Sequence, residues 1–486
     1  MRGIDAAAIY LPLYRLSADA IAEARGTAPS GIETTAVAAA DEDAFTMAVA
    51  AAERTLASTG VDRSAVESVS FASTTPPLAE EAFAPRLVRA LGLPRTVATA
   101  DHTQGTLAGA EGLSRALDAS GPALVAIADC PASDPGDADG QGAGAAAFLV
   151  VDGAAVGIRE PGWYADEYPG VRYREQGTER VASLGVTTYE RSAIRQCVAE
   201  AIGALGGDPD ADPDASGHGG DGDADPALHA AALHQPDGRM PGRIARDLAV
   251  GARSVERGTV VDTIGDAGAA TVPIGLASAL ATAAEGDRSL AGFFGSGGGG
   301  AAFVFEGSLD VAGIDDGDLP AGEEIAYAAT LRKRGAIVDG DVAGGGANVS
   351  VPNWRRTLDQ RYRLVAGRCP ACGGCQFPPE GACTACGARV EFEPVELPRT
   401  GTVEARTVIG QGGAPPEFAV HQARAGAYGV AIVGFDIDEG HLTLPGQLTD
   451  ADPEAVAVGD EVRPTVRRID DQEGVVRYGA KFVPTA

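Results

Sequence analysis

The chain has 486 residues, of which 45% are hydrophobic, so it is long enough for about three domains with cores of their own. It carries 68 acidic and 38 basic residues, for a formal net charge of −30, and its only lysines are Lys333 and Lys481. This balance excludes the basic face that general nucleic-acid binding requires, so we expect no nucleic-acid partner.

Neither a membrane span nor a secretion signal is recognisable in the sequence. No stretch reaches the roughly 20 uninterrupted apolar residues of a membrane span, and residues 1–5 lack the apolar core of a signal peptide. We therefore expect a cytoplasmic protein with no membrane partner. The acidic, lysine-poor composition is typical of proteins from salt-accumulating halophiles, because concentrated salt screens the repulsion between like charges.

Three segments of the first 310 residues each have a similar second copy, in the same order. The pairs are Arg86–Leu91 with Arg243–Leu248, Gly112–Leu117 with Gly275–Leu280, and Ala146–Val150 with Ala301–Phe305. Their spacing is far longer than the roughly 20–50 residues of a solenoid repeat. The repetition predicts two similar α/β halves, about residues 1–160 and 161–310, with a ligand site in the cleft between them.

Short apolar runs and amphipathic segments define the expected elements of these halves. In the first half we expect strands at Ser68–Ser73 and Leu124–Ala128, and helices at Asp43–Leu56 and Leu107–Leu117. The second half resumes near Tyr189 and contains Gly206–Pro226, a segment rich in Asp, Gly and Pro. Such a segment cannot bury apolar surface, so it predicts a solvated loop.

The last third of the chain has a different pattern. A glycine-rich linker at 336–350 precedes Trp354–Leu364, which predicts a short amphipathic helix leading into a group of cysteines. Short β runs follow at Gly401–Val408, Tyr428–Asp436, Gly459–Ile469 and Val475–Val483. With their Gly and Pro turns, these runs predict a small all-β barrel of the OB type over residues 390–486.

Four of the seven cysteines form two Cys-x-x-Cys pairs: Cys369 with Cys372, and Cys383 with Cys386. Each pair places two thiolates on one tight turn, and two such turns complete a tetrahedron around Zn²⁺. The alternative is a metal-free or iron-bound rubredoxin-like knuckle. Because four thiolates close the coordination shell, we expect a structural zinc ribbon at 351–389; Cys375 lies outside the pattern.

Two parts of the sequence resemble known families. His234–Gly238, Ile264–Asp266 and Phe294–Gly297 resemble archaeal-type hydroxymethylglutaryl-CoA synthases, and the resemblance covers about residues 1–335. That family belongs to the thiolase superfamily, whose fold is two similar βαβαβαββ halves. Val351–Trp354, the four cysteines and Phe377–Pro379 resemble the acyl-CoA-associated zinc-ribbon/OB-fold proteins that accompany archaeal thiolases and synthases.

The first resemblance implies a set of site residues. The synthases use a cysteine nucleophile, a glutamate acid/base and a histidine; the matching positions here are Thr106, Thr74 and His234. Asp266 takes the place of an Asn that the superfamily often uses. We also expect substrate contacts, and a CoA ester as the ligand, from four residues: Arg239, Arg243, Ser296 and Gly297.

The missing thiol and carboxylate leave several interpretations open. A hydroxyl is a much weaker nucleophile than a thiolate, so Thr106 is either a nucleophile with an unidentified base or a helix N-cap. His234 is either a base or a hydrogen-bonded remnant of an active ancestor. Asp266 either orients His234 or accepts hydrogen bonds from its own loop. His102 is a further base candidate. The arginines either bind CoA phosphates or are simply solvated.

Three functions follow from these alternatives. The first is an acyl-CoA-binding, non-condensing or scaffold member of a thiolase/synthase system. The second is an aldol or retro-aldol enzyme that uses His234, and the third is ordinary acetyl transfer with Thr106 as the nucleophile. We also expect a homodimer through the thiolase-like halves, with the Ala-rich strands Ala145–Val151 and Ala301–Phe305 suited to close packing.

Overall fold

The computed structural model describes residues 2–132, 140–205, 228–248, 250–315, 317–337, 350–410, 419–438, 440–472 and 474–485. They divide into two compact units. Unit 1 contains residues 1–38, 43–87 and 96–336, and unit 2 contains residues 337–486 together with 39–42 and 88–95. The acidic segment Gly206–Pro226 and most of the expected linker lie outside the described residues. Among the described residues, no helix is long and apolar enough to cross a membrane.

Unit 1 is built on one eleven-stranded sheet. Its path runs β12-β13-β14-β8-β1-β7-β6-β4-β5, with β15 beside β1 and β9 beside β14. The strands are β1 (Arg2–Tyr10), β4 (Ser68–Ala72), β5 (Ala98–His102), β6 (Ala123–Asp129), β7 (Gly144–Asp152), β8 (Val156–Ile158), β9 (Gly162–Tyr164), β12 (Ala230–Leu233), β13 (Arg288–Phe294), β14 (Gly300–Glu306) and β15 (Val311–Ala312). The strands predicted at 68–73 and 124–128 are β4 and β6.

The predicted duplication is confirmed. The paired segments fall in α3 (Ala84–Ala90) and α6 (Met240–Asp247), in α4 (Ala108–Leu117) and α9 (Thr271–Thr282), and in β7 and β14. Their registers correspond as well: Ala146 of β7 lies opposite Ile127 in antiparallel β6, and Ala301 of β14 lies opposite Phe293 in antiparallel β13. The two halves are therefore copies of one α/β arrangement.

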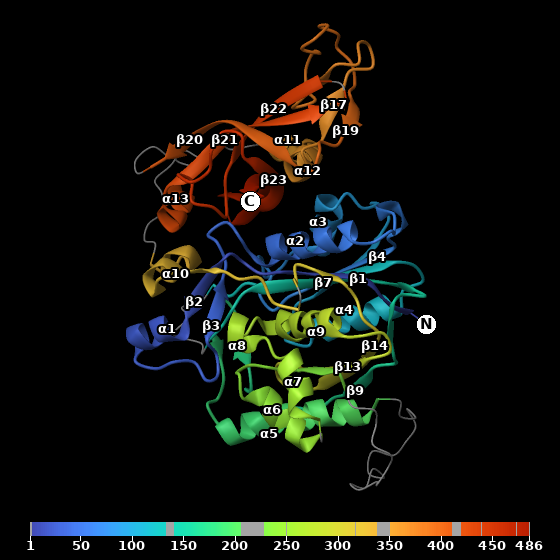
Figure 1. The fold of residues 1–486 in the computed structure, drawn as a ribbon, viewed down its shortest axis with the longest axis vertical. Coiled ribbons are helices and arrows are strands. Elements are labelled where there is room, and N and C mark those ends of the chain that lie inside the picture. Colours follow the sequence, from blue (N-terminus) through green and yellow to red (C-terminus); the bar gives the residue numbers. More distant parts are fainter. Residues whose placement is uncertain are drawn as a thin grey trace. The chain divides into compact units, whose positions relative to one another are not determined.

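The helices form layers around the strands of the two halves. Figure 1 shows α4 and α9 between those strands, with α2 (Ala44–Ala57) on the outer face of β1, β6 and β7. The opposite outer face is covered by α5 (Thr187–Gly203) together with α6 and α7 (Ala252–Gly258). A Cβ on Gly109 of α4 would lie 3.1 Å from the carbonyl oxygen of Ala269, so α4 approaches the start of α9 closely.

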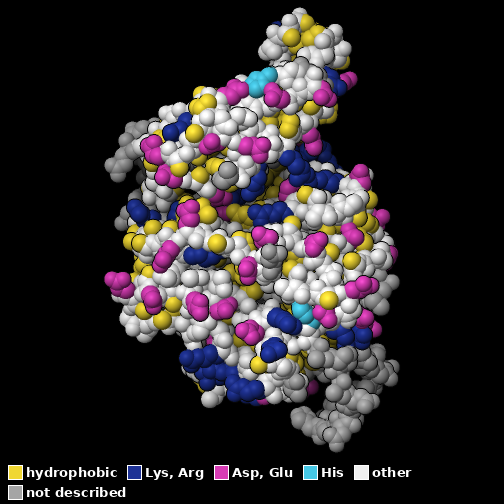
Figure 2. All heavy atoms as spheres, viewed as in Figure 1, with side chains coloured by type: hydrophobic (Ala, Val, Ile, Leu, Met, Phe, Trp, Pro, Cys, Tyr) yellow, Lys and Arg dark blue, Asp and Glu magenta, His cyan; other side chains and the backbone are white. Residues whose placement is uncertain are grey.

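Smaller elements complete unit 1. They are β2 (Tyr14–Ser17), α1 (Ala18–Arg25), β3 (Thr34–Val37), β10 (Tyr173–Arg174), β11 (Val181–Ala182), α8 (Val261–Ile264), β16 (Glu323–Glu324) and α10 (Tyr327–Arg334). On the surface, basic side chains gather over α5 and α6, at the lower edge of the face in Figure 2, and on these helices they are all arginines. The arginines of these two helices are Arg191, Arg195, Arg243 and Arg246.

The described residues of unit 2 form three short helices, a ribbon and a barrel. Its elements are α11 (Val351–Arg356), α12 (Leu358–Arg363), β17 (Ala366–Arg368), β18 (Cys375–Gln376), β19 (Glu393–Val395), β20 (Gly401–Ile409), α13 (Ala419–Ala425), β21 (Tyr428–Ile437), β22 (Gly440–Gln447), β23 (Glu461–Gln472) and β24 (Val475–Pro484). The helix predicted at 354–364 is divided at Thr357. The ring of Trp354 lies between the guanidinium groups of Arg361 and Arg477, 4.2 Å and 4.8 Å from its centroid.

The predicted small barrel is confirmed. Its five antiparallel strands run in the order β22-β21-β20-β23-β24, and a bridge from Leu448 to Phe482 nearly closes the sheet. The sequence predicted four of these strands and missed β22, whose residues Pro445 and Gly446 interrupt an apolar run. Arg467 and Lys481 are both only 1% exposed, although they are basic residues.

Candidate functional site

Thr106 lies at the start of α4, where the first half meets a turn of the second half. Its side chain is buried, and its Oγ1 donates to the carbonyl oxygen of Phe294 at 2.5 Å. Its backbone N–H donates to Oγ of Ser296 at 3.3 Å. The N-cap residue of α4 is Leu107, which makes no side-chain capping bond, so the N-cap interpretation of Thr106 is wrong. The hydroxyl instead joins two loops from different halves.

His234 follows β12 and is almost completely buried. Its ring lies 5.4 Å from the ring of Phe294, the residue whose carbonyl oxygen binds Thr106. Burial lowers the pKa of His234 to about 4; the Asp266 carboxylate raises this pKa and the Arg172 guanidinium lowers it further. His234 is therefore neutral at pH 7, and it is a weaker base than an unperturbed imidazole.

Asp266 lies beside His234 but is bound to other groups. Its Oδ1 accepts hydrogen bonds from the backbone N–H of Gly268 at 2.9 Å and from Oγ1 of Thr271 at 3.4 Å. Its Oδ2 accepts from Nη1 of Arg172 at 2.5 Å, and the side chains of this ion pair are 16% and 6% exposed. Asp266 therefore accepts hydrogen bonds from its own loop and forms an ion pair with an arginine that the sequence did not indicate.

Thr74 lies at the end of β4 and is held by a buried carboxylate. Its backbone N–H donates to Oδ1 of Asp129 at 2.6 Å, and its hydroxyl donates to Oδ2 at 2.9 Å. Its carbonyl oxygen accepts from the guanidinium of Arg174. Burial raises the pKa of Asp129, and hydrogen bonds from Ala269, Thr75, Thr74 and Ser73 oppose this rise. Thr74 thus has no free hydrogen to offer a substrate.

The side chains of both halves enclose a small polar cavity. Its lining includes Thr74, Asp129, Asp266, Arg172 and Arg174. The space left among them is about 10 Å³, room for one water molecule. Of the residues that the resemblance assigns, Thr74 and Asp266 line this cavity, whereas Thr106 and His234 do not.

The expected substrate-binding residues lie around this centre. Ser296 contacts Thr106, and Gly297 has φ +90° in the turn between β13 and β14. Arg239 is exposed directly before α6, and Arg243 lies one helical turn later; neither makes a side-chain hydrogen bond or ion pair within the described chain. Their side chains are available for a ligand anion.

The remaining candidates lie elsewhere. Nδ1 of His102, at the end of β5, is 3.4 Å from Glu111, and both residues line a separate groove along α4. The backbone N–H of Cys130 donates to Oγ1 of Thr75. Burial raises the pKa of the Cys197 thiol to about 11, so it is unreactive at neutral pH.

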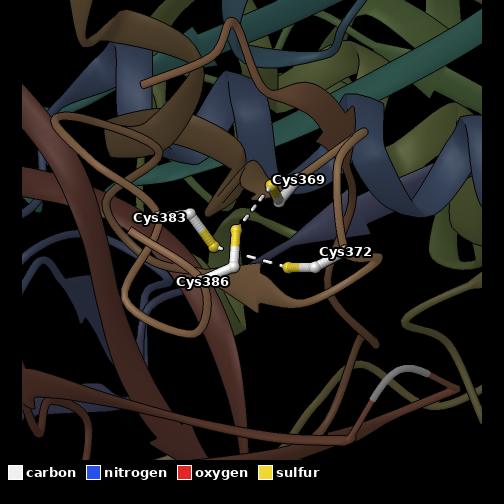
Figure 3. Close-up of side chains that lie close together, drawn as sticks. All are labelled: Cys369, Cys372, Cys383 and Cys386. Atoms are coloured by element: carbon white, nitrogen blue, oxygen red, sulfur yellow. Dashed lines mark hydrogen bonds between the residues drawn. The ribbon is translucent and has the colours of Figure 1, made fainter. Parts of the chain in front are cut away.

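The four paired cysteines form the strongest binding arrangement in unit 2 (Figure 3). Their sulfurs all lie within 4.8 Å of one another, with Cys369 3.8 Å from Cys386 and Cys372 3.7 Å from Cys383. Four ligands about 2.3 Å from a tetrahedral Zn²⁺ are separated by about 3.8 Å, so these sulfurs fit zinc. Cys375 lies outside this group, in β18.

Glycines shape both turns of this site. Gly373 donates to the carbonyl oxygen of Cys369 and Gly387 to that of Cys383, each at 2.8 Å. Their φ angles are +77° and +73°, a backbone conformation that a side chain disfavours. Each glycine therefore lets the chain turn back tightly after its pair of ligands.

Comparison with known proteins gives the family. A hydroxymethylglutaryl-CoA synthase of Pyrobaculum neutrophilum is 30% identical over 317 residues, which cover 62% of this chain and 86% of that protein. The chain belongs to the hydroxymethylglutaryl-CoA synthase family. Residues 356–393 match the ChsH2, rubredoxin-like zinc ribbon domain. A DUF35 domain-containing scaffold protein of Methanocaldococcus jannaschii is 35% identical over 136 residues, which cover 28% of this chain and 89% of that protein.

Solved structures support the thiolase-like fold. The HMG synthase of the curacin biosynthetic pathway aligns with a TM-score of 0.58 at 19% identity, covering 69% of this chain and 89% of that one. The 3-oxoacyl-(acyl carrier protein) synthase III of Pseudomonas aeruginosa aligns with a TM-score of 0.53 at 20% identity, covering 63% and 98%. Both expected resemblances, to the synthases and to the zinc-ribbon proteins, are confirmed.

Replacement of Cys369 by Ser tests the metal site. We expect the purified wild-type chain to hold about one zinc ion and Cys369→Ser to lose it, because three thiolates no longer close the tetrahedral shell. Metal analysis by mass spectrometry measures the content. Cys375→Ser is the matched control and should keep its zinc; full retention in Cys369→Ser would contradict the assignment.

The depressed pKa of His234 predicts a pH dependence of stability. Between about pH 6.5 and pH 4 the unfolded chain takes up a proton at His234 and the folded chain does not, so the free energy of unfolding should fall as the pH falls. The loss across this window is about 3 kcal/mol. Denaturant unfolding of wild type and His234→Asn at both pH values measures it; equal pH dependence in the two proteins would be evidence against the buried neutral ring.

Proposed function

We propose that this chain binds acyl-CoA at the site between its two halves but performs no condensation through a covalent acyl-enzyme. It acts as a non-condensing or scaffold member of a thiolase/synthase system. The observation that carries the proposal is the environment of Thr106: its hydroxyl is buried and donates its hydrogen to a carbonyl oxygen. A hydroxyl becomes a nucleophile only when a base removes that hydrogen, and no base contacts it within the described chain.

The other site residues support the same proposal. Thr74 gives both of its hydrogen-bond donors to Asp129 and lacks the carboxyl group of a general acid. Asp266 is paired with Arg172, and His234 has no hydrogen-bond partner within the described chain. Thr74 and Asp266 are thus each bound to another side chain of the cavity, and neither is free to act as a general acid.

Binding of acyl-CoA rests on the family and on charge. The relative from Pyrobaculum neutrophilum is named as a hydroxymethylglutaryl-CoA synthase, and the arginines over α5 and α6 form a basic area on an otherwise strongly acidic chain. Arg239 and Arg243 are near His234 in sequence, and guanidinium groups bind phosphate oxygens well. The zinc ribbon and barrel contribute a second module, similar to a protein named as a scaffold. We expect its zinc to be structural, and its barrel to be of the OB type.

One observation favours a second candidate, an aldol or retro-aldol reaction on an acyl-CoA. The ring of His234 is neutral at pH 7, because burial lowers its pKa, so it can accept a proton from a bound hydroxyl group. Incubation with a panel of acyl-CoA esters and product analysis distinguishes the two functions. Cleavage or formation of a carbon–carbon bond that disappears in His234→Asn would support the aldol reaction over simple binding.

A homodimer is also proposed, through the edge of the large sheet. Strand β5 is the last strand of the sheet path, and its residues are partly or fully exposed. A groove of about 590 Å³ follows it along α4. Because an open edge strand attracts another strand, a twofold partner at β5 would cover it. The Ala-rich strands expected at the interface, β7 and β14, are buried inside the chain, so that part of the expectation is wrong.

Acyl-CoA binding without acylation is the direct test. Calorimetry in concentrated salt should detect acetyl-CoA binding that weakens roughly tenfold in Arg239→Ala or Arg243→Ala, through loss of a charge-assisted bond to phosphate. Arg159→Ala, which removes a surface pair with Glu306, is the control and should bind normally. Intact mass after incubation should reveal no acetyl group; an adduct at Thr106 would restore ordinary synthase chemistry.

Light scattering tests the dimer. At micromolar concentration in concentrated salt, the mass should be near twice the 49.0 kDa of one chain. Thr99→Glu adds a negative charge to the exposed edge strand of each copy and should shift the population toward monomer. Val475→Glu places the same charge on an exposed site of the barrel and should leave the dimer intact. A stable wild-type monomer would exclude this arrangement.

A further inference from the structure

Asp266 lies near two basic side chains, the charged Arg172 and the neutral His234, and it forms a hydrogen bond with Arg172. Its position is fixed by the backbone, since its N–H donates to the carbonyl oxygen of Gly140 at 2.9 Å and its carbonyl oxygen accepts from Gly142 at 3.0 Å. Its Oδ2 binds Arg172 at 2.5 Å. His234 is close enough for the Asp266 charge to act on it, yet its ring makes no hydrogen bond within the described chain.

We propose that Arg172 is a positioning residue, which binds the Asp266 carboxylate in a buried ion pair and thereby keeps that carboxylate from orienting and charging His234. The inference deepens the proposed function and rests on it, because the basicity of His234 matters to an acyl-CoA only if this is its site. Arg172 acts through Asp266, not on the substrate.

The strength of this ion pair follows from its burial. The Arg172 and Asp266 side chains are 16% and 6% exposed, so little water screens them, and a charge-assisted hydrogen bond of this kind is short and strong. Asp129, the other buried carboxylate of the cavity, accepts hydrogen bonds from the segment 73–75 and from Ala269. Asp266 is therefore the carboxylate for which Arg172 and His234 compete.

The segment that carries Arg172 is attached separately from the large sheet. Among the described residues, strands β10 and β11 form a sheet of their own, through Tyr173 opposite Ala182 and Arg174 opposite Val181. Arg174 extends from the same hairpin to the carbonyl oxygen of Thr74. Both arginines can therefore leave the cavity together without breaking any strand pairing of the large sheet.

The cavity beside Arg172 is too small to hold an acyl group while the arginine stays in place. The space beside Arg172 holds about one water molecule, so an acyl group enters only if the arginine moves. When Arg172 leaves, Asp266 Oδ2 loses its hydrogen-bond partner. His234 is then the basic side chain that remains near the Asp266 carboxylate. An imidazole next to an unpaired buried carboxylate is a stronger base than one whose carboxylate is bound to an arginine.

The charged groups that act on His234 are few. The Asp266 carboxylate raises the pKa of its ring and the Arg172 guanidinium lowers it, while the remaining cause is burial. The Phe294 ring covers another side and carries no charge. Removing the positive charge of Arg172 should therefore raise the pKa of His234 on two grounds: repulsion of the imidazolium is lost, and the Asp266 charge is no longer neutralised.

The test is a titration of the histidine ring signals by NMR in the full-length protein without any CoA ester. The His234 signal is assigned by its loss in His234→Asn. In Arg172→Gln its pKa should rise by about one pH unit or more above the wild-type value. Arg172→Lys keeps the positive charge and should titrate close to wild type, which a purely steric role of Arg172 would not predict.

Two further variants keep the outcome decisive. Arg174→Gln removes the neighbouring arginine, whose partner is a carbonyl oxygen, and should leave the His234 titration unchanged. Arg172→Met replaces Arg172→Gln if the latter does not fold, and should produce the same rise. A His234 pKa within about 0.3 of wild type in a folded Arg172→Gln or Arg172→Met protein would overturn the inference.

Addition of acetyl-CoA separates the inference from the function on which it rests. Entry of the ester should raise the wild-type His234 pKa toward that of Arg172→Gln, since it displaces the arginine. If no ester binds, the proposed function fails while the titration without CoA still measures the competition for Asp266. If the ester binds and the His234 signal does not shift, displacement of Arg172 is wrong and acyl-CoA binding stands.

Discussion

The buried carboxylate of Asp129 is the constraint on which the site depends. It lies at the end of β6 and accepts hydrogen bonds from Ser73, Thr74 and Thr75 at the end of β4, all in the first half. It also accepts from the backbone N–H of Ala269, which leads into α9 of the second half, at 2.6 Å. One side chain therefore joins the two halves, and removing it would leave several buried donors without a partner.

Close backbone contacts make this junction possible. A Cβ on Gly268 would lie 2.2 Å from Oδ2 of Asp129, and one on Gly142 would lie 1.7 Å from the carbonyl oxygen of Ile264. Glycine is needed at both positions, because any side chain would separate the loops that carry Asp266 and Asp129. The two halves thus meet through main-chain atoms, and the charged side chains occupy the little space that remains.

The sequence predicted features with a strong pattern and missed those without one. Repeated segments such as Gly112–Leu117 and Gly275–Leu280 indicated the duplication, and the spacing of the paired cysteines indicated the ribbon. Asp129 ends a buried apolar strand, and this pattern in the sequence indicates a carboxylate at the edge of the core. Arg172 had no signal, because the two-residue strands of its hairpin are polar and short. Its pairing with Asp266 spans 94 positions and depends on tertiary structure alone.

The scarcity of lysine has a practical consequence. Lys481 is 1% exposed and bound to a carboxylate, which leaves Lys333, lying 3.9 Å over the ring of Tyr14, as the one accessible side-chain amine in the sequence. Amine-directed reagents, and enzymes that acetylate or ubiquitinate lysine, therefore find a single side-chain target on a chain of 486 residues. Coupled to a surface through that residue, every molecule would be held in the same orientation, at the helix α10 that carries it.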